Sequence, residues 1–94
     1  MQESDAIKRL LTSCSDIKPL WDDHLALWGD VDAGSYNEIG VIAEYLIDQY
    51  AVSNTEDFES IFTTVEQLLS EANESIEGLL VVGLLEDIHN YALL

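Results

Sequence analysis

The stretch from Leu79 to Tyr91 constrains the fold most, because it is apolar nearly all round. Apolar residues continue at helical spacing from Ile76 to Tyr91, and a helix without a polar face belongs inside a bundle. Its Leu-Leu-Val-Val run is also a fair β signal, but a lone strand would have no partner elsewhere in this chain. We therefore predict an apolar last helix at the centre of the fold. Gly78 and Gly83, which weaken a helix by roughly 1 kcal/mol each, should mark places where a neighbour approaches its backbone.

Two helices are predicted before the first clear loop. The first follows Ser4 or Asp5 as a cap and shows the i, i+3, i+4, i+7 pattern in Ile7, Leu10, Leu11 and Cys14. The second runs from Pro19, which a first helical turn tolerates, to Gly29, a good C-terminal stop. Its apolar stripe contains Trp21, Leu25 and Trp28. We expect both tryptophans in the core, or one of them exposed beside Asp22 and Asp23.

Two more helices follow the loop at 29–34. Ser35–Glu38 and Ser53–Glu56 both have the pattern of a capping box, in which a hydroxyl and a carboxylate satisfy the first free amides. Apolar residues recur at helical spacing from Ile39 to Tyr50, and again from Phe58 to Ala72. No linker, repeat or low-complexity stretch divides the chain. The sequence therefore predicts an all-α protein, with residues 1–94 forming one small helical bundle of four to five helices.

The charge is distributed unevenly along the chain. Nineteen acids accompany three bases, and from Pro19 to Leu94 there are sixteen acids and no Lys or Arg. A compact chain of this length is ~30 Å across, and duplex DNA carries ~18 charges over the same span. A surface selected only for solubility mixes both signs, since opposite charges pair favourably along helices. The pattern therefore indicates a strongly basic partner and argues against direct binding of nucleic acid, whose phosphates would be repelled.

Catalytic and metal-binding patterns are incomplete in this sequence. Glu86 and His89 have the Glu-x-x-His spacing of di-iron bundles, but the second such pair is absent. The loop from Asp30 to Gly34 resembles the start of a calcium loop, yet its glycine is one position early and Val41 stands where a bidentate Glu is needed. Cys14 lies on an apolar stripe and is expected to pack as a small hydrophobe. We predict no enzyme activity, no metal and no cofactor.

The expected compartment is the cytoplasm. A single cysteine excludes an internal disulfide framework and agrees with a reducing environment. The first five residues lack the features of a signal peptide, and no apolar run is long enough to span a membrane. Self-association is left open by the sequence.

The predicted partner-binding surface consists of residues away from the core faces. On the third helix, Val41 and Tyr45 fall among acids, as expected for contact residues, since interface centres favour aromatics ringed by polar groups; a wide apolar stripe would explain the same two residues. Further acids lie at the beginnings of the third and fourth helices, where they also stabilise the helix dipole. The full set is Asp30, Asp32, Glu38, Val41, Glu44, Tyr45, Asp48, Glu56, Asp57 and Glu59.

The C-terminal part of the chain resembles a bacterial family of small helical domains of the immunity-protein type. The resemblance is carried by Phe62–Leu69, by Asn73–Ile76 and by Val81–Asn90, and extends more loosely from Tyr36. These motifs are mainly core pattern, so no functional residue is transferred. The resemblance implies a partner of a bacterial toxin.

Three functions follow as hypotheses. The first is an immunity or antitoxin-like protein that occludes the basic groove of a bacterial toxin such as a nuclease. The second is a phage-encoded nucleic-acid mimic of the anti-CRISPR or anti-restriction type, which shares the mechanism and differs in the partner. The third is a small metal-binding protein or enzyme. A neighbouring toxin gene would favour the first hypothesis and neighbouring phage genes the second.

Overall fold

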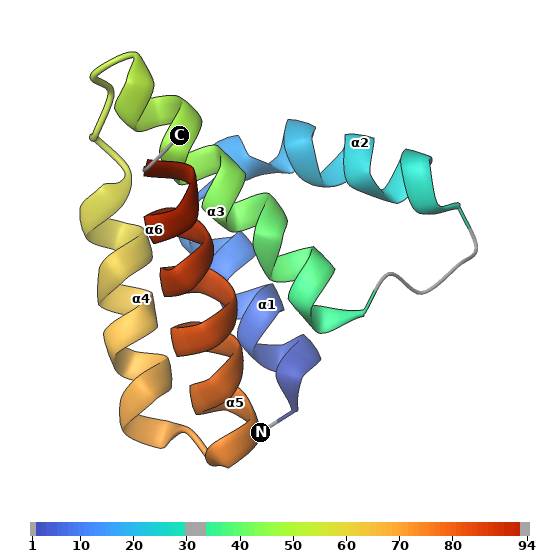
Figure 1. The fold of residues 1–94 in the computed structure, drawn as a ribbon, viewed down its shortest axis with the longest axis vertical. Coiled ribbons are helices and arrows are strands. Elements are labelled where there is room, and N and C mark those ends of the chain that lie inside the picture. Colours follow the sequence, from blue (N-terminus) through green and yellow to red (C-terminus); the bar gives the residue numbers. More distant parts are fainter. Residues whose placement is uncertain (1, 30–33, 93–94) are drawn as a thin grey trace.

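The fold was described in a computed structural model covering residues 2–29 and 34–92, with side chains to residue 90. Every regular element in these ranges is helical, which confirms the predicted all-α class (Figure 1). In chain order the elements are α1 (Glu3–Ser13), η1 (Ser15–Ile17), α2 (Lys18–Trp28), α3 (Ser35–Ala51), α4 (Phe58–Glu71), α5 (Glu74–Gly78), η2 (Leu79–Leu85) and α6 (Glu86–Ala92).

The elements α5, η2 and α6 follow one another directly and form a single continuous helix, drawn in orange and red in Figure 1. With these three joined, the described residues contain five helices and the short 3₁₀ turn η1. The middle part, η2, is a π-helix, in which each bond reaches one residue further than in an α-helix. The last helix lies between α3 and α4 in Figure 1 and buries Leu79, Leu80 and Leu84. Its other side is at the surface, because Val81, Val82 and Leu85 are exposed, so the predicted position at the centre of the fold is wrong for that side.

The helix α3 is the most enclosed element of the bundle. It packs against α1, η1, α2, η2 and α6, so neighbours cover it on more than one side. Its buried residues are consequently not confined to one stripe: they are Ile39, Val41, Ile42, Ala43, Tyr45 and Leu46. In contrast, α4 buries Ile61, Val65 and Leu68 along one face, as its regular spacing predicts. The radius of gyration is 12.6 Å.

The helix α2 differs from the others because none of its residues is buried. It extends away from the bundle in Figure 1, and its hydrophobic residues that pack against the core are the partly buried Leu20 and Trp21. Leu25, Leu27 and Trp28 are exposed, Leu27 to 83%. The expectation that both tryptophans lie in the core is therefore wrong: Trp21 is only partly buried, and Trp28 is exposed, as the alternative allowed.

The predicted helix beginnings are wrong at three places. The helix α1 begins at Glu3 with Gln2 as its cap, earlier than a cap at Ser4 or Asp5 would allow, and α3 has Gly34 rather than Ser35 in that position. In the predicted capping box at Ser53–Glu56, the first two residues instead form part of the C-terminal capping motif of α3. Ser53 adopts a positive φ of 60°, and Asn54 donates its amide to the Gln49 carbonyl over 2.8 Å. This combination is the Schellman pattern of a helix end.

None of the helices in the described ranges is both long and apolar enough to cross a membrane. The predicted end of α2 at Gly29 and the short turn before the last helix are confirmed. Gly29 has a φ of 59°, and the Asn73 side chain accepts a hydrogen bond from the Ile76 amide over 3.0 Å.

Candidate partner-binding groove

The residues predicted to bind a partner differ in their exposure. Asp30 and Asp32 lie outside the described residues. Glu44, Asp48, Glu56 and Glu59 are exposed, while Glu38 and Asp57 are partly buried. The predicted exposure of Val41 and Tyr45 is wrong: they are only 6% and 3% exposed, because neighbouring elements cover the side of α3 that the helical pattern left for solvent.

Tyr45 is buried with an internal partner for its hydroxyl. The hydroxyl donates to Asp57 Oδ2 over 2.8 Å and accepts a weak hydrogen bond from Cys14 Sγ at 3.6 Å. Burial, followed by these two hydrogen bonds, raises the pKa of Tyr45 far above its usual range. The structure therefore brings the predicted site residues Tyr45 and Asp57 together, and with Cys14 they connect the end of α1, α3 and the start of α4.

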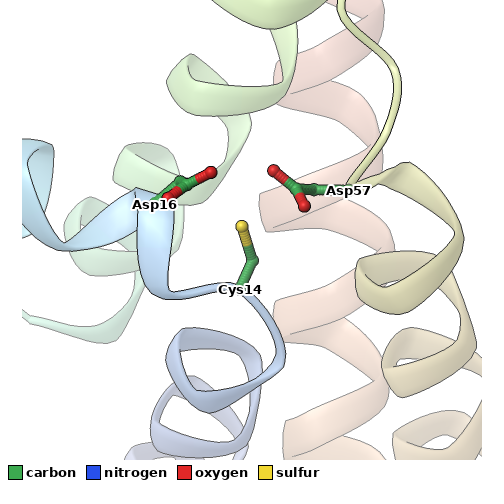
Figure 2. Close-up of side chains that lie close together, drawn as sticks. All are labelled: Cys14, Asp16 and Asp57. Atoms are coloured by element: carbon green, nitrogen blue, oxygen red, sulfur yellow. The ribbon is translucent and has the colours of Figure 1, made fainter.

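Cys14, Asp16 and Asp57 converge at the same place, as Figure 2 shows. Their possible ligand atoms all lie within 4.8 Å of one another, so these are the described side chains that could hold a metal ion together. Cys14 is a free, buried thiol, in agreement with its expected role as a packed small hydrophobe. The hydrogen bonds through Tyr45 account for the approach of Cys14 and Asp57.

Nearer the start of α3 is a groove of about 610 Å³ between α2, α3 and the last helix. We name it the α2–α3 groove. Val41 and Gly83 are its most buried residues and form its floor. The described residues that line it are His24, Trp28, Tyr36, Asn37, Gly40, Val41, Glu44, Val82, Gly83 and Asp87. Of the predicted site residues that the structure describes, only Val41 and Glu44 line it.

The groove combines aromatic and acidic side chains. Trp28 is 36% exposed and Tyr36 is 50% exposed, and both contribute apolar surface. Glu44 and Asp87 contribute carboxylates from two different elements. Burial, followed by the neighbouring charge of Glu86, raises the pKa of Asp87 above its usual value. The arrangement therefore suits a ligand that presents positive charge together with apolar surface.

Sequence reasoning missed Tyr36 and Asp87 as groove residues. The available signal was the pair of glycines in the last helix. A Cβ at Gly83 would lie 2.9 Å from Ile39 Cγ2 and 3.3 Å from the Tyr36 ring, and one at Gly78 would lie 3.3 Å from the Tyr36 hydroxyl. The predicted close approach at both glycines is confirmed, and the neighbour that lies over both is Tyr36.

A second hollow of about 530 Å³ lies between the ends of α3, α4 and the last helix. Its described lining is apolar or aromatic throughout: Leu46, Ile47, Tyr50, Ala51, Phe58, Phe62 and Ile88. This surface offers no carboxylate from those residues, so it has no direct relation to the charge of the chain.

The comparison with known proteins identifies the family. Residues 7–93 match the model of a family described as a domain of unknown function, DUF7674. Neither a curated protein nor a solved structure matches the chain. The matched range contains most of α1, all of α2 to α5 and η2, and every residue that lines the α2–α3 groove. The chain therefore belongs to the DUF7674 family.

Proposed function

We propose that the protein is a non-enzymatic, acidic binding domain that neutralises a basic protein partner by covering its basic surface. The proposal extends to an immunity or antitoxin-like role against a bacterial toxin such as a nuclease, acting in the cytoplasm. The observation that carries it is the α2–α3 groove, where the exposed rings of Trp28 and Tyr36 lie beside the carboxylates of Glu44 and Asp87.

The charge of the whole chain supports a basic partner. The formal net charge is −16. Two of the three cations already have acidic partners within the chain: Arg9 is 2.9 Å from Glu71, and Lys18 is 3.1 Å from Asp22. The remaining field is strongly negative, and such a field increases the rate at which an oppositely charged protein associates.

The side chains of the groove are suited to provide affinity for a partner, in addition to the faster association that the charge provides. Charge at a rim changes mainly the association rate, whereas buried aromatic anchors supply affinity. Trp28 and Tyr36, both exposed in the groove, have the residue types that dominate interface hot spots. A domain with both features can associate quickly and remain bound, as an inhibitor requires.

Affinity capture with charge-reversal variants tests the proposal. The wild-type protein and two variants are immobilised and exposed to lysate of the native host. The groove variant carries Glu44→Lys and Asp87→Lys. The matched variant carries Glu56→Lys and Glu59→Lys at the start of α4, which changes the net charge equally. Captured proteins are eluted with sodium chloride and identified, and the activity of each is measured with and without the wild-type protein.

We expect a basic protein that the wild type captures, that salt releases and whose activity falls when the acidic protein is added in equal amount. Loss of capture with either variant would support the function, and the variant that loses it identifies the face. Capture that neither reversal weakens, release that does not depend on salt, or undiminished activity of the captured protein would each overturn the proposal.

A further inference from the structure

The aromatic side chains of α2 support one another along one side of the helix. The rings of Trp21 and His24 are stacked with centroids 5.4 Å apart, and those of His24 and Trp28 are 6.2 Å apart. The Trp21 ring packs partly against the core, so the row of three rings holds Trp28 at the edge of the α2–α3 groove. A ring held in place loses less entropy when it binds a ligand.

Tyr36 is held on the opposite side of the groove by the last helix. Its ring lies against the backbone of Gly83 and its hydroxyl lies near Gly78, since a Cβ at either position would come within 3.3 Å of it. Half of the residue remains exposed. The segment that receives the ring is the π-helix η2, and π-helical turns occur frequently at functional sites.

Asp87 reaches the groove from the last helix and lies close to α3 at Gly40. A Cβ at Gly40 would make an ordinary van der Waals contact with Asp87 Oδ2, at 3.7 Å. The carboxylate is partly withdrawn from water, and its attraction to a cation is therefore stronger than that of an exposed acid. Glu44 provides a second, exposed carboxylate in the same groove.

We propose that the α2–α3 groove receives an arginine side chain from the basic partner, with the guanidinium between the aromatic rings of Trp28 and Tyr36 and the carboxylates of Glu44 and Asp87. This inference rests on the proposed function and names the chemistry that the partner must present. A guanidinium is planar, stacks on aromatic rings and forms paired hydrogen bonds with carboxylates. A lysine ammonium makes a point contact and is more strongly hydrated, so it should bind this combination of aromatic rings and carboxylates more weakly than a guanidinium does.

Synthetic peptides provide the test. The first probe is an amphipathic helical peptide with leucines on one side and arginines on the other. In the second, citrulline replaces every arginine, which removes the charge and retains the shape. In the third, lysine replaces every arginine. Binding to the isotope-labelled full chain is followed by NMR, using the Trp28 indole and the Gly40 and Gly83 amides as reporters of the groove.

The matched protein variants are Asp87→Asn in the groove and Glu66→Gln on the exposed side of α4, which remove the same charge. Losing a charged hydrogen bond of about 1.5 kcal/mol corresponds to a roughly tenfold weaker affinity. We expect that loss for Asp87→Asn and less than about a twofold change for Glu66→Gln. Circular dichroism verifies that both variants retain the helical fold.

Arginine binding at the groove reporters, weaker binding by the lysine peptide and none by the citrulline peptide would support the inference. Equal weakening by both variants would show attraction to the overall charge alone and would overturn the groove while leaving the proposed function intact. Equal affinity of the citrulline or lysine peptide, or shifts confined to residues outside the groove, would overturn it as well. Failure of the proposed function itself is seen separately, in the capture experiment.

Discussion

The helices α2 and α4 both contain apolar residues at helical spacing, but they differ in how far the fold buries them. The helix α4 buries Ile61, Val65 and Leu68 against its neighbours, whereas α2 buries none of its residues completely. An apolar stripe therefore predicts that a helix face contacts another apolar surface, but it does not indicate whether that surface belongs to the same chain. The apolar face of α4 packs against the core. In contrast, α2 contributes apolar surface to the α2–α3 groove, where we propose that a partner binds.

The strongest way to break this comparison is to truncate one leucine in each region. Leu68 on α4 is fully buried, and Leu68→Ala should cost about 2–5 kcal/mol of stability because it leaves a cavity. Leu27 on α2 is 83% exposed. The variant Leu27→Ala should therefore change stability by no more than about 0.5 kcal/mol. Urea unfolding measures both. A similar cost for the two variants would show that α2 belongs to the core after all.

A pair of glycine substitutions sharpens the comparison at the groove. Gly83→Ala places a methyl group 2.9 Å from Ile39, which is fully buried. It should cost about 1–3 kcal/mol through overpacking. Gly40→Ala meets only an ordinary contact at 3.7 Å. It should be neutral or gain up to about 1 kcal/mol from helix propensity. Thermal unfolding distinguishes them. If Gly83→Ala stabilised the protein, this result would contradict the close contact between Tyr36 and the last helix.

Tyrosine hydroxyls test the polar contact within the bundle. Tyr45→Phe removes the donor to Asp57 and should cost about 1 kcal/mol, the usual contribution of an internal hydrogen bond. Tyr50 is 70% exposed, so Tyr50→Phe serves as the control. This exposed substitution should change stability only slightly. Both are measured by denaturant unfolding at neutral pH. Equal values would mean that the Tyr45 hydroxyl contributes no more than one in solvent.

The smallest expected effect concerns Asp87 and depends on pH. Its pKa is raised in the folded state, chiefly by burial, so its ionised form opposes folding at neutral pH. This cost disappears as the pH falls through the folded pKa and is gone below the unfolded value of about 3.9. Asp87→Asn should therefore stabilise the protein at neutral pH by up to about 0.5 kcal/mol and should have no such advantage below about pH 3.

Asp48→Asn is the control for this effect, because it removes the same charge from an exposed position on α3. The stability of the wild type and both variants is compared across the pH range by chemical unfolding. If the two variants gain equally at neutral pH, general repulsion among the acids and not the groove environment is responsible.

The sequence allowed the all-α class, the number of helices and the buried face of α4 to be predicted, because hydrophobic periodicity is a local property. It did not allow the burial of Tyr45 to be predicted. The helical pattern places that residue away from the main stripe of α3, and only the arrangement of η1 and α4 supplies its cover and its partner Asp57. Side-chain partners that come from distant elements have no local signal.

The candidate site was less predictable than the fold for the same reason. Val41 and Glu44 were identified, but their groove depends on how α2 projects from the bundle and on the rotation of the last helix. Helix beginnings failed where Ser53 and Asn54 could serve either the end of one helix or the start of the next. Local preference was compatible with both, and the packing of α3 decided between them.

The π-helix makes one part of the last helix tolerant of a change in length. Each residue of an α-helix turns the next side chain by about 100°, and a π-helical segment contains more residues per turn. Deleting one residue near Val81 or Val82 would therefore be absorbed by a return to α-helical bonding. Asp87 would keep its place above Gly40, and Ile88 its place at the core edge. A one-residue gap here, in an otherwise similar relative, is therefore compatible with the same groove, whereas a gap elsewhere in the last helix would turn everything beyond it by about one such step.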